Sequence, residues 1–147
     1  MRPCKSAGGT RNEPAALTEK GTGKRTGKGR EKRRRARRAG LRAETAAAWF
    51  LRCKGYRIEA QNLRTPVGEI DIAARRGGTL AIVEVKHRPE AGDLGSAVTA
   101  AQQRRLVNAA NWLLSARPGL ARLTVRFDVV LVTPGRLPLH LPNAWQA

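Results

Sequence analysis

Charged and apolar side chains alternate in two neighbouring segments of the sequence, GEIDIA and IVEVK. Side chains along a β-strand point alternately to its two faces. If both segments are strands, the side chains of Glu69 and Asp71 point to the same face of the first strand. Those of Glu84 and Lys86 point to the same face of the second. Carboxylates gathered beside a lysine are suited to binding a hard divalent cation and to hydrolysing phosphodiester bonds.

A Gly-Gly pair stands between these two segments and predicts a β-hairpin. With a loop centred on the two glycines, Asp71 lies opposite Glu84 and Glu69 lies opposite Lys86. Like charges on directly opposed residues destabilise a sheet unless a positive charge lies between them. A divalent metal ion would supply that charge.

The expected metal ligands are Asp71, Glu84 and the backbone carbonyl of Val85, with Mg²⁺ or Mn²⁺ as the ion. Lys86 lies two residues beyond Glu84 on the same face, where it can orient the attacking water or offset charge in the transition state. The alternative is structural. In that case Glu69 and Lys86 form a cross-strand salt bridge, and the other two acids face solvent on a half-exposed sheet.

The flanking sequence predicts an α/β fold in which a mixed sheet carries helices, in the order α-β-β-β-α-β. Ala-rich sequence followed by Lys-Gly predicts the first helix, and Pro118-Gly119 ends the second, which Ser96 can cap. The expected elements around the hairpin are a helix over 41–54, a strand over 56–63, a helix over 96–117, a strand over 121–132 and at most an edge strand after it.

Two polar residues lie on apolar stripes of the expected helices. Glu44 in the first helix either reaches a solvated site or is a first-turn acid stabilised by the helix dipole. Gln102 in the second helix either bonds to nearby backbone or belongs to the site, while Arg104 points outward. In the last strand, Asp128 is expected to be a structural partner of Arg126 or a helix.

The formal charge is +18, with 29 Lys and Arg against 11 Asp and Glu, and indicates a polyanionic partner, with nucleic acid ahead of a membrane surface. Residues 1–40 hold 14 of these basic residues and almost no large apolar ones, so we expect a disordered tail before a domain over residues 41–147. The tail, including Arg33, Arg34 and Arg35, is either an arm that binds phosphates or a solvated extension, or it reflects a wrongly assigned start.

Cys4 and Cys53 have no Cys or His partner at metal-binding spacing, so a zinc site is unsupported. The sequence has no apolar run that could serve as a secretory signal or span a bilayer. A cytoplasmic protein is therefore expected. His140 is a lone histidine, and a surface or packing role is expected for it.

The pairing of GEIDIA with IVEVK resembles the PD-(D/E)xK nuclease superfamily. More narrowly, residues 41–147 resemble the YraN-type family of small bacterial proteins, which is related in fold to archaeal Holliday-junction resolvases. The resemblance rests on an ordered set of motifs that follows the helix with Glu44: KGYRI, QNLR, GEID, VEVKHR, AVTAAQQRRL and RFDVV.

This resemblance implies a restriction-endonuclease-like core in which Asp71, Glu84 and Lys86 match metal and catalytic positions. It also implies site roles for Glu44 and Glu69, which match acids that recur in the narrower family. His87 stands where a small hydroxyl residue is frequent. Gln102-Gln103 stands where relatives often carry Lys or Gln, which leaves open which of the two glutamines faces the site.

The expected function is a Mg²⁺- or Mn²⁺-dependent endonuclease acting on DNA, including branched or single-stranded forms. The alternative is a nucleic-acid-binding module with a vestigial nuclease site. RNA is less favoured than DNA because the chain has six aromatic residues and no aromatic sheet motif for stacking bases. No membrane partner is expected, and resolution of a junction would require a homodimer with two sites.

Overall fold

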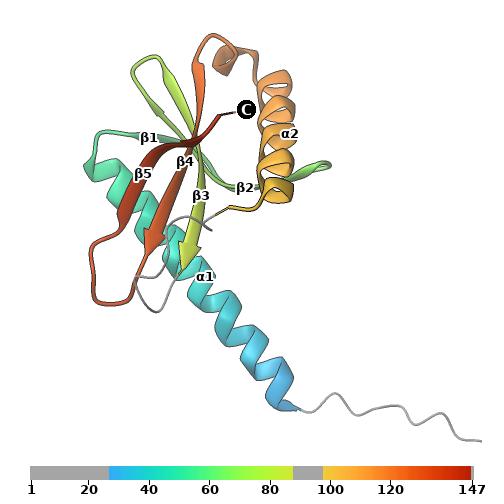
Figure 1. Ribbon diagram of the computed structural model, residues 1–147, viewed down its shortest axis with the longest axis vertical. Coiled ribbons are helices and arrows are strands. Elements are labelled where there is room, and N and C mark those ends of the chain that lie inside the picture. The colour runs from blue at the N-terminus through green and yellow to red at the C-terminus, as the bar shows by residue number, and fades with distance from the viewer. Residues whose placement is uncertain (1–26, 88–97, 147) are drawn as a thin grey trace, which may run out of the picture.

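A computed structural model describes residues 27–87 and 98–146 of the chain (Figure 1). The predicted order α-β-β-β-α-β is confirmed, with a further strand at the position where prolines were expected to allow an edge strand. The elements are α1 (Gly27–Cys53), β1 (Arg57–Thr65), β2 (Gly68–Arg76), β3 (Thr79–His87), α2 (Ala100–Ala116), the short 3-10 helix η2 (Pro118–Leu120), β4 (Thr124–Val132) and β5 (Leu139–Trp145).

The five strands form one mixed sheet in the order β1-β2-β3-β4-β5. Strands β3 and β4 are parallel and joined through α2, and the other neighbours are antiparallel. The hairpin of β2 and β3 has the predicted register, since Ile72 lies opposite Val83 and Arg76 lies opposite Thr79. Gly77 in its loop has a φ of 57°, a left-handed conformation that glycine adopts without steric cost.

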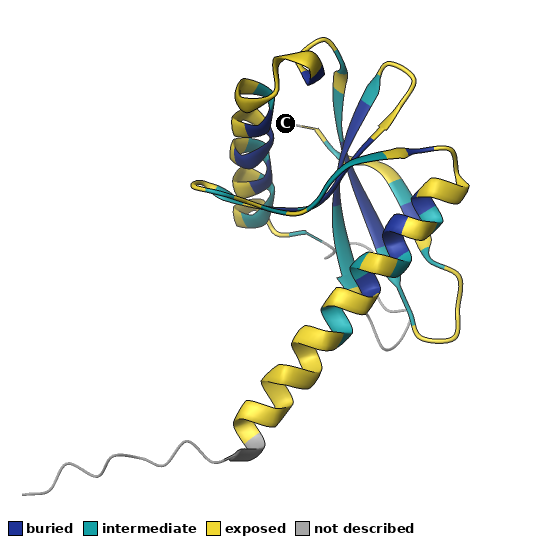
Figure 2. Cartoon of the chain, turned by 180° about the vertical axis from the view of Figure 1, so that it is seen from behind, coloured by how far each residue is buried: buried dark blue, intermediate teal, exposed yellow. Residues whose placement is uncertain are grey.

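The two helices cover opposite faces of the sheet and define two apolar clusters (Figures 1 and 2). Leu106 and Leu113 of α2 pack with Leu80 and Ile82 of β3. The other cluster lies under α1 and contains Ala47, Leu51, Tyr56, Ile72, Val83 and Val130. Neighbouring residues of β3 therefore pack against different helices, so this strand is buried on both faces.

In β2 the side chains do not alternate strictly between the two faces of the sheet. Ile70 packs in the α2 cluster and Ile72 packs in the α1 cluster, although the two were expected to point the same way. The break lies at Asp71, where the register of β2 with β3 also ends, because Ile72 and Val83 are the last pair. The hairpin thus opens at the point where its acidic residues begin.

Helix α1 begins at Gly27, well before the expected start at Leu41. The expectation of disorder up to residue 40 is therefore corrected for residues 27–40, while residues 1–26 lie outside the described residues. Arg, Lys and Ala dominate the added turns and are good helix formers. Since the later turns are held by packing, these turns extend an existing helix and avoid the cost of nucleation.

Helix α2 is capped by Thr99, and the expected cap, Ser96, lies outside the described residues. Thr99 and Gln102 form a capping box, in which each side chain accepts a hydrogen bond from the backbone N–H of the other. At the other end, the N–H of Arg117 bonds to the carbonyl of Leu113 before Pro118. Neither α1 nor α2 is long and apolar enough to cross a membrane.

Candidate functional site

The open end of the β2–β3 hairpin brings Asp71 against β3. The backbone N–H of Val85 donates a hydrogen bond of 2.8 Å to Asp71 Oδ2. This carboxylate therefore occupies the place of a backbone acceptor just after the last paired residues of the two strands. Asp71 is therefore close to Glu84, which precedes Val85. The expected cross-strand pairs of Asp71 with Glu84 and of Glu69 with Lys86 are wrong, because the ladder ends at Ile72 and Val83.

Glu84 and Lys86 form an ion pair along their own strand. The distance between Lys86 Nζ and Glu84 Oε1 is 2.8 Å, and both side chains are largely buried. The structural alternative, a cross-strand salt bridge between Glu69 and Lys86, is wrong. Glu69 pairs with Arg64 on β1, and the distance between Arg64 Nε and Glu69 Oε1 is 3.6 Å. Arg64 lies directly opposite Glu69 in the register of β1 and β2.

The pKa of Asp71 is raised from its ordinary value to about 7. Burial is the main cause, and the charges of Glu84 and Glu44 raise the pKa further. The hydrogen bond from Val85 and the charge of Lys86 lower it but do not compensate. Burial thus outweighs both interactions that stabilise the charged form of Asp71.

Glu44 reaches this cluster from α1. Burial raises its pKa, a hydrogen bond with the Asn62 side chain lowers it, and the charges of Glu69 and Glu84 raise it. Its Oε2 atom is buried and has no hydrogen-bond partner among the residues that the structure describes. Because α1 begins at Gly27, Glu44 is far from the first turn, and the helix-dipole explanation is wrong.

Sequence reasoning missed the role of Asn62. This residue has a φ of 53°, although it lies inside β1, and its side chain bonds to Glu44. The flanking pairs, Gln61 with Ile72 and Leu63 with Ile70, place it beside Asp71. Asn tolerates the left-handed region better than most residues and is otherwise depleted in strands. An asparagine within the expected strand was the available signal.

A pocket of about 490 Å³ opens over Asp71 and Glu84. Gln102 lines this pocket, whereas Gln103 donates to the carbonyl of Val98 and lines a different hollow. Gln102 is thus the glutamine that lines the pocket, and its side chain also accepts a hydrogen bond from the backbone N–H of Thr99, as the structural alternative expected. The complete lining is Arg64, Thr65, Gly68, Glu69, Asp71, Glu84, Gln102, Arg105 and Leu106.

Two arginines at the pocket were not among the predicted site residues. Arg64 comes from β1 and Arg105 from α2, so they approach from different elements. Arg104 is exposed as expected and lines the hollow with Gln103 outside this pocket. Its binding to nucleic acid stays a prediction, and Arg105 is the arginine of α2 that faces the acids.

Mg²⁺ and Mn²⁺ take hard oxygen ligands, a class that includes carboxylates. Within residues 27–87 and 98–146, no group of three or more His, Cys, Asp or Glu side chains has the geometry to hold a metal ion. Mg²⁺ is often bound by only one or two carboxylates, with waters and substrate phosphates completing its shell. Asp71 and Glu84 line the pocket and can supply those carboxylates. The carbonyl of Val85 stays a predicted ligand.

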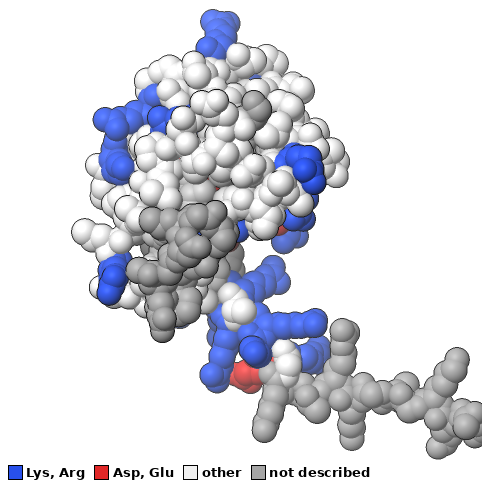
Figure 3. Space-filling view, in the orientation of Figure 1, with Lys and Arg blue, Asp and Glu red and all other residues white. Residues whose placement is uncertain are grey.

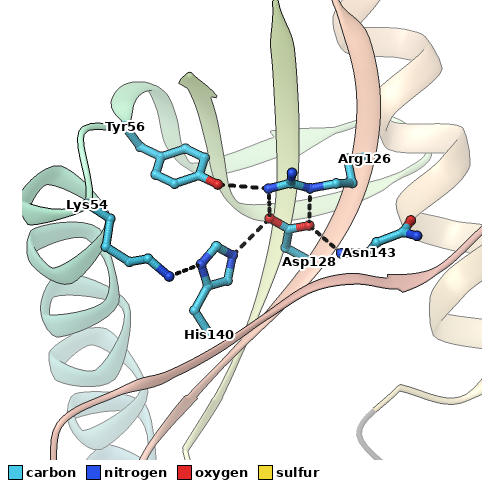
Figure 4. Close-up of polar contacts among 6 residues, drawn as sticks. All are labelled: Lys54, Tyr56, Arg126, Asp128, His140 and Asn143. Carbon is cyan, nitrogen blue, oxygen red and sulfur yellow. Dashed lines mark hydrogen bonds and ion pairs between the residues drawn. The ribbon is translucent and has the colours of Figure 1, made fainter. Parts of the chain in front are cut away.

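Asp128 belongs to a separate polar network, shown in Figure 4, and its predicted structural role is confirmed. Two nitrogens of Arg126 donate to its carboxylate at 2.8 Å each. His140 Nε2 and the backbone N–H of Asn143 also lie at 2.9 Å from its oxygens. Burial raises the pKa of Asp128, but these hydrogen bonds outweigh burial and lower it to about 2.

This network connects β4 to β5 and to the end of α1. Arg126 also donates to the hydroxyl of Tyr56 at 2.8 Å, and Lys54 Nζ lies 2.9 Å from His140 Nδ1. The side chain of His140 is buried, so its packing role is confirmed. None of these residues lines the pocket over Asp71.

Comparison with known proteins identifies close relatives. A family model described as "Uncharacterised protein family UPF0102" matches residues 43–132. The chain is 54% identical over 107 residues to a "UPF0102 protein" of Parvibaculum lavamentivorans, covering 73% of this chain and 80% of that one. It is 52% identical over 108 residues to one of Rhodopseudomonas palustris, covering 74% and 84%. It is 51% identical over 106 residues to one of Caulobacter vibrioides, covering 72% and 85%.

Proposed function

Since the chain belongs to the UPF0102 family, the YraN-type family that its ordered motifs resemble, we propose that it binds DNA and hydrolyses phosphodiester bonds in the pocket over Asp71. The observation that carries this proposal is the position of Asp71. Its carboxylate is bonded to β3 beside the Glu84–Lys86 pair, and its pKa is raised to about 7. A cluster of acids in this state favours a bound cation.

Mg²⁺ or Mn²⁺ held by Asp71 and Glu84 would polarise the phosphate and lower the pKa of a bound water. Lys86 lies on the same face and can orient the attacking water or offset negative charge on the pentacoordinate phosphorus. Glu44 and Glu69 add negative charge around the two proposed ligands. Asn62 holds the Glu44 carboxylate by its side-chain hydrogen bond.

Arg64 and Arg105 supply the complementary charge for the substrate. Both line the pocket, and Gln102 is a further polar group in its lining. Arginine binds phosphate oxygens in a bidentate geometry. DNA phosphates in the pocket would therefore have arginines from β1 and α2 available as partners beside Asp71 and Glu84.

The proposal is tested by incubating the protein with duplex, single-stranded and four-way-junction DNA in Mn²⁺, Mg²⁺ or EDTA. Cleavage is expected only with metal, and Glu84→Gln or Lys86→Ala should lower the rate at least about 100-fold, the scale typical of acid–base and electrostatic groups. Glu59→Gln is the matched control, because Glu59 pairs with Arg57 at 3.7 Å and does not line the pocket. Cleavage that survives both site substitutions would overturn the assignment.

Titration calorimetry with Mn²⁺ gives a readout that does not depend on turnover. The wild-type protein is expected to bind Mn²⁺, and the Asp71→Asn and Glu84→Gln variants are expected to bind it at least about 10-fold more weakly, because each removes one of two carboxylate ligands. Equal affinity in all three proteins would exclude this pair as the metal site.

A second candidate is a nucleic-acid-binding module without catalysis. The Glu84–Lys86 ion pair favours it, because a carboxylate held by a lysine at 2.8 Å is less available to a metal ion. DNA binding in EDTA with no cleavage in any metal would support this reading. A homodimer and a cytoplasmic location remain parts of the proposal, and cleavage of junctions on both strands would require the dimer.

A further inference from the structure

The first half of α1 projects away from the folded body (Figures 1 and 2). We call residues 29–42 the α1 arm. Its residues 29–38 are all exposed, and the first buried residue of the helix is Ala43. The family model begins at this same residue 43, so the α1 arm lies outside the matched region. The site described above therefore does not account for it.

The α1 arm has a high density of positive charge, and Figure 3 shows Lys and Arg side chains standing out from it. It contains eight basic residues and one acid, Glu31, which gives a net charge of +7. Glu31 pairs with Arg35 at 3.4 Å. The basic residues are Arg30, Lys32, Arg33, Arg34, Arg35, Arg37, Arg38 and Arg42.

These charges surround the helix. At 100° per residue, Arg33 and Arg38 lie on different sides of the axis, and Lys32 and Arg35 lie on others. The α1 arm has no apolar face, whereas a helix that lies in a membrane surface needs one. A helix with positive charge on all sides suits a partner that places phosphates on more than one side of it.

The major groove of duplex DNA is such an environment. It is about 12 Å wide, and a helix with its side chains is about 10–12 Å across, so phosphates flank the helix on both sides. The major groove of duplex RNA is too narrow and deep for this fit. A single strand offers only one row of phosphates. Duplex DNA is the partner that the α1 arm fits.

The helix also connects the α1 arm to the site. Arg42 precedes Glu44 by two residues, and the charge of Glu44 acts on Asp71. At about 1.5 Å per residue, Arg38 lies ~9 Å and Arg30 ~21 Å from Glu44 along the axis. Base pairs are about 3.4 Å apart along DNA. The charged part of the arm can thus span several base pairs in line with Glu44.

We infer that the α1 arm lies in the major groove of duplex DNA and holds the duplex beside the pocket by binding phosphates on both sides of the groove. The choice of DNA rests on the proposed function, but binding by the arm does not require cleavage. The test is therefore carried out in EDTA, so its failure and the failure of the nuclease proposal are separate results.

The first experiment neutralises four arm residues, Arg33, Arg34, Arg37 and Arg38, by substitution with Gln, which keeps helix propensity. The control variant carries the same change at four exposed arginines of the body: Arg57, Arg75, Arg122 and Arg136. Both variants lose four charges. Fluorescence anisotropy with a labelled 20-base-pair duplex is measured over a range of NaCl concentrations, and circular dichroism confirms that both variants fold.

The arm variant should bind at least about 10-fold more weakly, and its plot of log K against log salt should become shallower by about 2–4, since each phosphate contact contributes about 0.9. The control should change the slope by less than about 1. Equal losses in the two variants would overturn the inference. The same binding measurement is made with single-stranded DNA and with vesicles of anionic phospholipid. The inference would also be overturned if the arm variant lost more affinity for single-stranded than for duplex DNA. It would be overturned as well if the arm variant lost affinity for the vesicles alone.

The second experiment separates a rigid helix from a flexible polycation. Ala36→Pro keeps every charge but breaks or kinks the α1 arm, because proline removes a helical hydrogen bond and clashes with the preceding turn. Affinity for the duplex should fall at least about 3-fold relative to Ala36→Gln, which keeps the helix. Equal affinity of the Pro and Gln variants would overturn groove binding by a rigid arm.

Discussion

At the scale of single residues, Asp71 combines burial, charge and backbone pairing. It stands where the β2–β3 ladder ends, and it bonds to Val85 in place of a backbone carbonyl. Burial and the charges of Glu84 and Glu44 raise its pKa to about 7. The position of Asp71 is therefore unfavourable for a charged carboxylate in the metal-free protein.

Asp71 should make the metal-free protein less stable as pH rises. Its pKa is about 7 in the folded protein and near the ordinary value of 3.8 in the unfolded chain. The folded state therefore binds the extra proton between these values, and the free energy of unfolding falls from about pH 4 to pH 7. Asp71→Asn keeps an acceptor for Val85 and removes this ionisation.

We expect the melting temperature of Asp71→Asn in EDTA to exceed that of the wild type at pH 8 by several degrees, the shift that ~1–2 kcal/mol produces in a domain of this size. The difference should shrink toward pH 4. Thermal unfolding followed by circular dichroism from pH 4 to 8 measures it. A constant difference across this range would contradict the raised pKa.

At the scale of elements, the close approach of β2 to α2 forms one wall of the pocket. A Cβ built on Gly68 would lie 2.9 Å from the backbone carbonyl oxygen of Arg105, a distance at which the backbone must shift. Both residues line the pocket with Asp71. The absence of a side chain at Gly68 thus lets α2 bring Arg105 and Gln102 near the acids.

Gly68→Ala is therefore expected to destabilise the protein by about 1–3 kcal/mol, the range for overpacking, and to weaken DNA binding because α2 is displaced. Gly78→Ala is the matched control, since nothing lies within 4 Å of its added Cβ and its φ is not positive. Urea unfolding of the two variants measures the effect. Equal free energies of unfolding would show that α2 adjusts without cost.

At the scale of the whole molecule, the polar network around Asp128 connects β4 to β5 and to the end of α1. Asp128 is fully buried and accepts hydrogen bonds from Arg126 and from the backbone of Asn143. Through His140 and Tyr56 the network joins segments that are far apart in the sequence. Removing one member of a buried charged pair leaves the other uncompensated.

We expect Asp128→Asn to cost about 3–5 kcal/mol, because Arg126 loses its charged partner. The pKa of Asp128 is lowered to about 2 in the folded protein, so its contribution is present above about pH 4 and is lost as pH falls toward 2. Arg126→Gln with Asp128→Asn should cost less than the sum of the single changes. Urea unfolding at pH 7 and pH 3 measures these values, and a cost that does not decrease at pH 3 would contradict the lowered pKa.

The hairpin was predictable from sequence because it depends on local rules. Alternation along β3 placed Glu84 and Lys86 on one face, and the Gly-Gly loop set the register that pairs Ile72 with Val83. The order of elements follows from similar short-range signals. For the same reason Asp128 could be recognised as a partner of Arg126, two residues away on the same face.

Other features were decided only by the tertiary structure, since they depend on how distant segments meet. Glu44 reached the acids because α1 crosses the end of the sheet, and Glu69 paired with Arg64 because β1 lies beside β2. The packing of α2 against Gly68 selected Gln102 and Arg105 for the pocket. Sequence alone determined the order of the elements and the pairing of the hairpin, because these depend on short-range patterns. The three-dimensional packing determined which residues share one site, because burial and charge act through space.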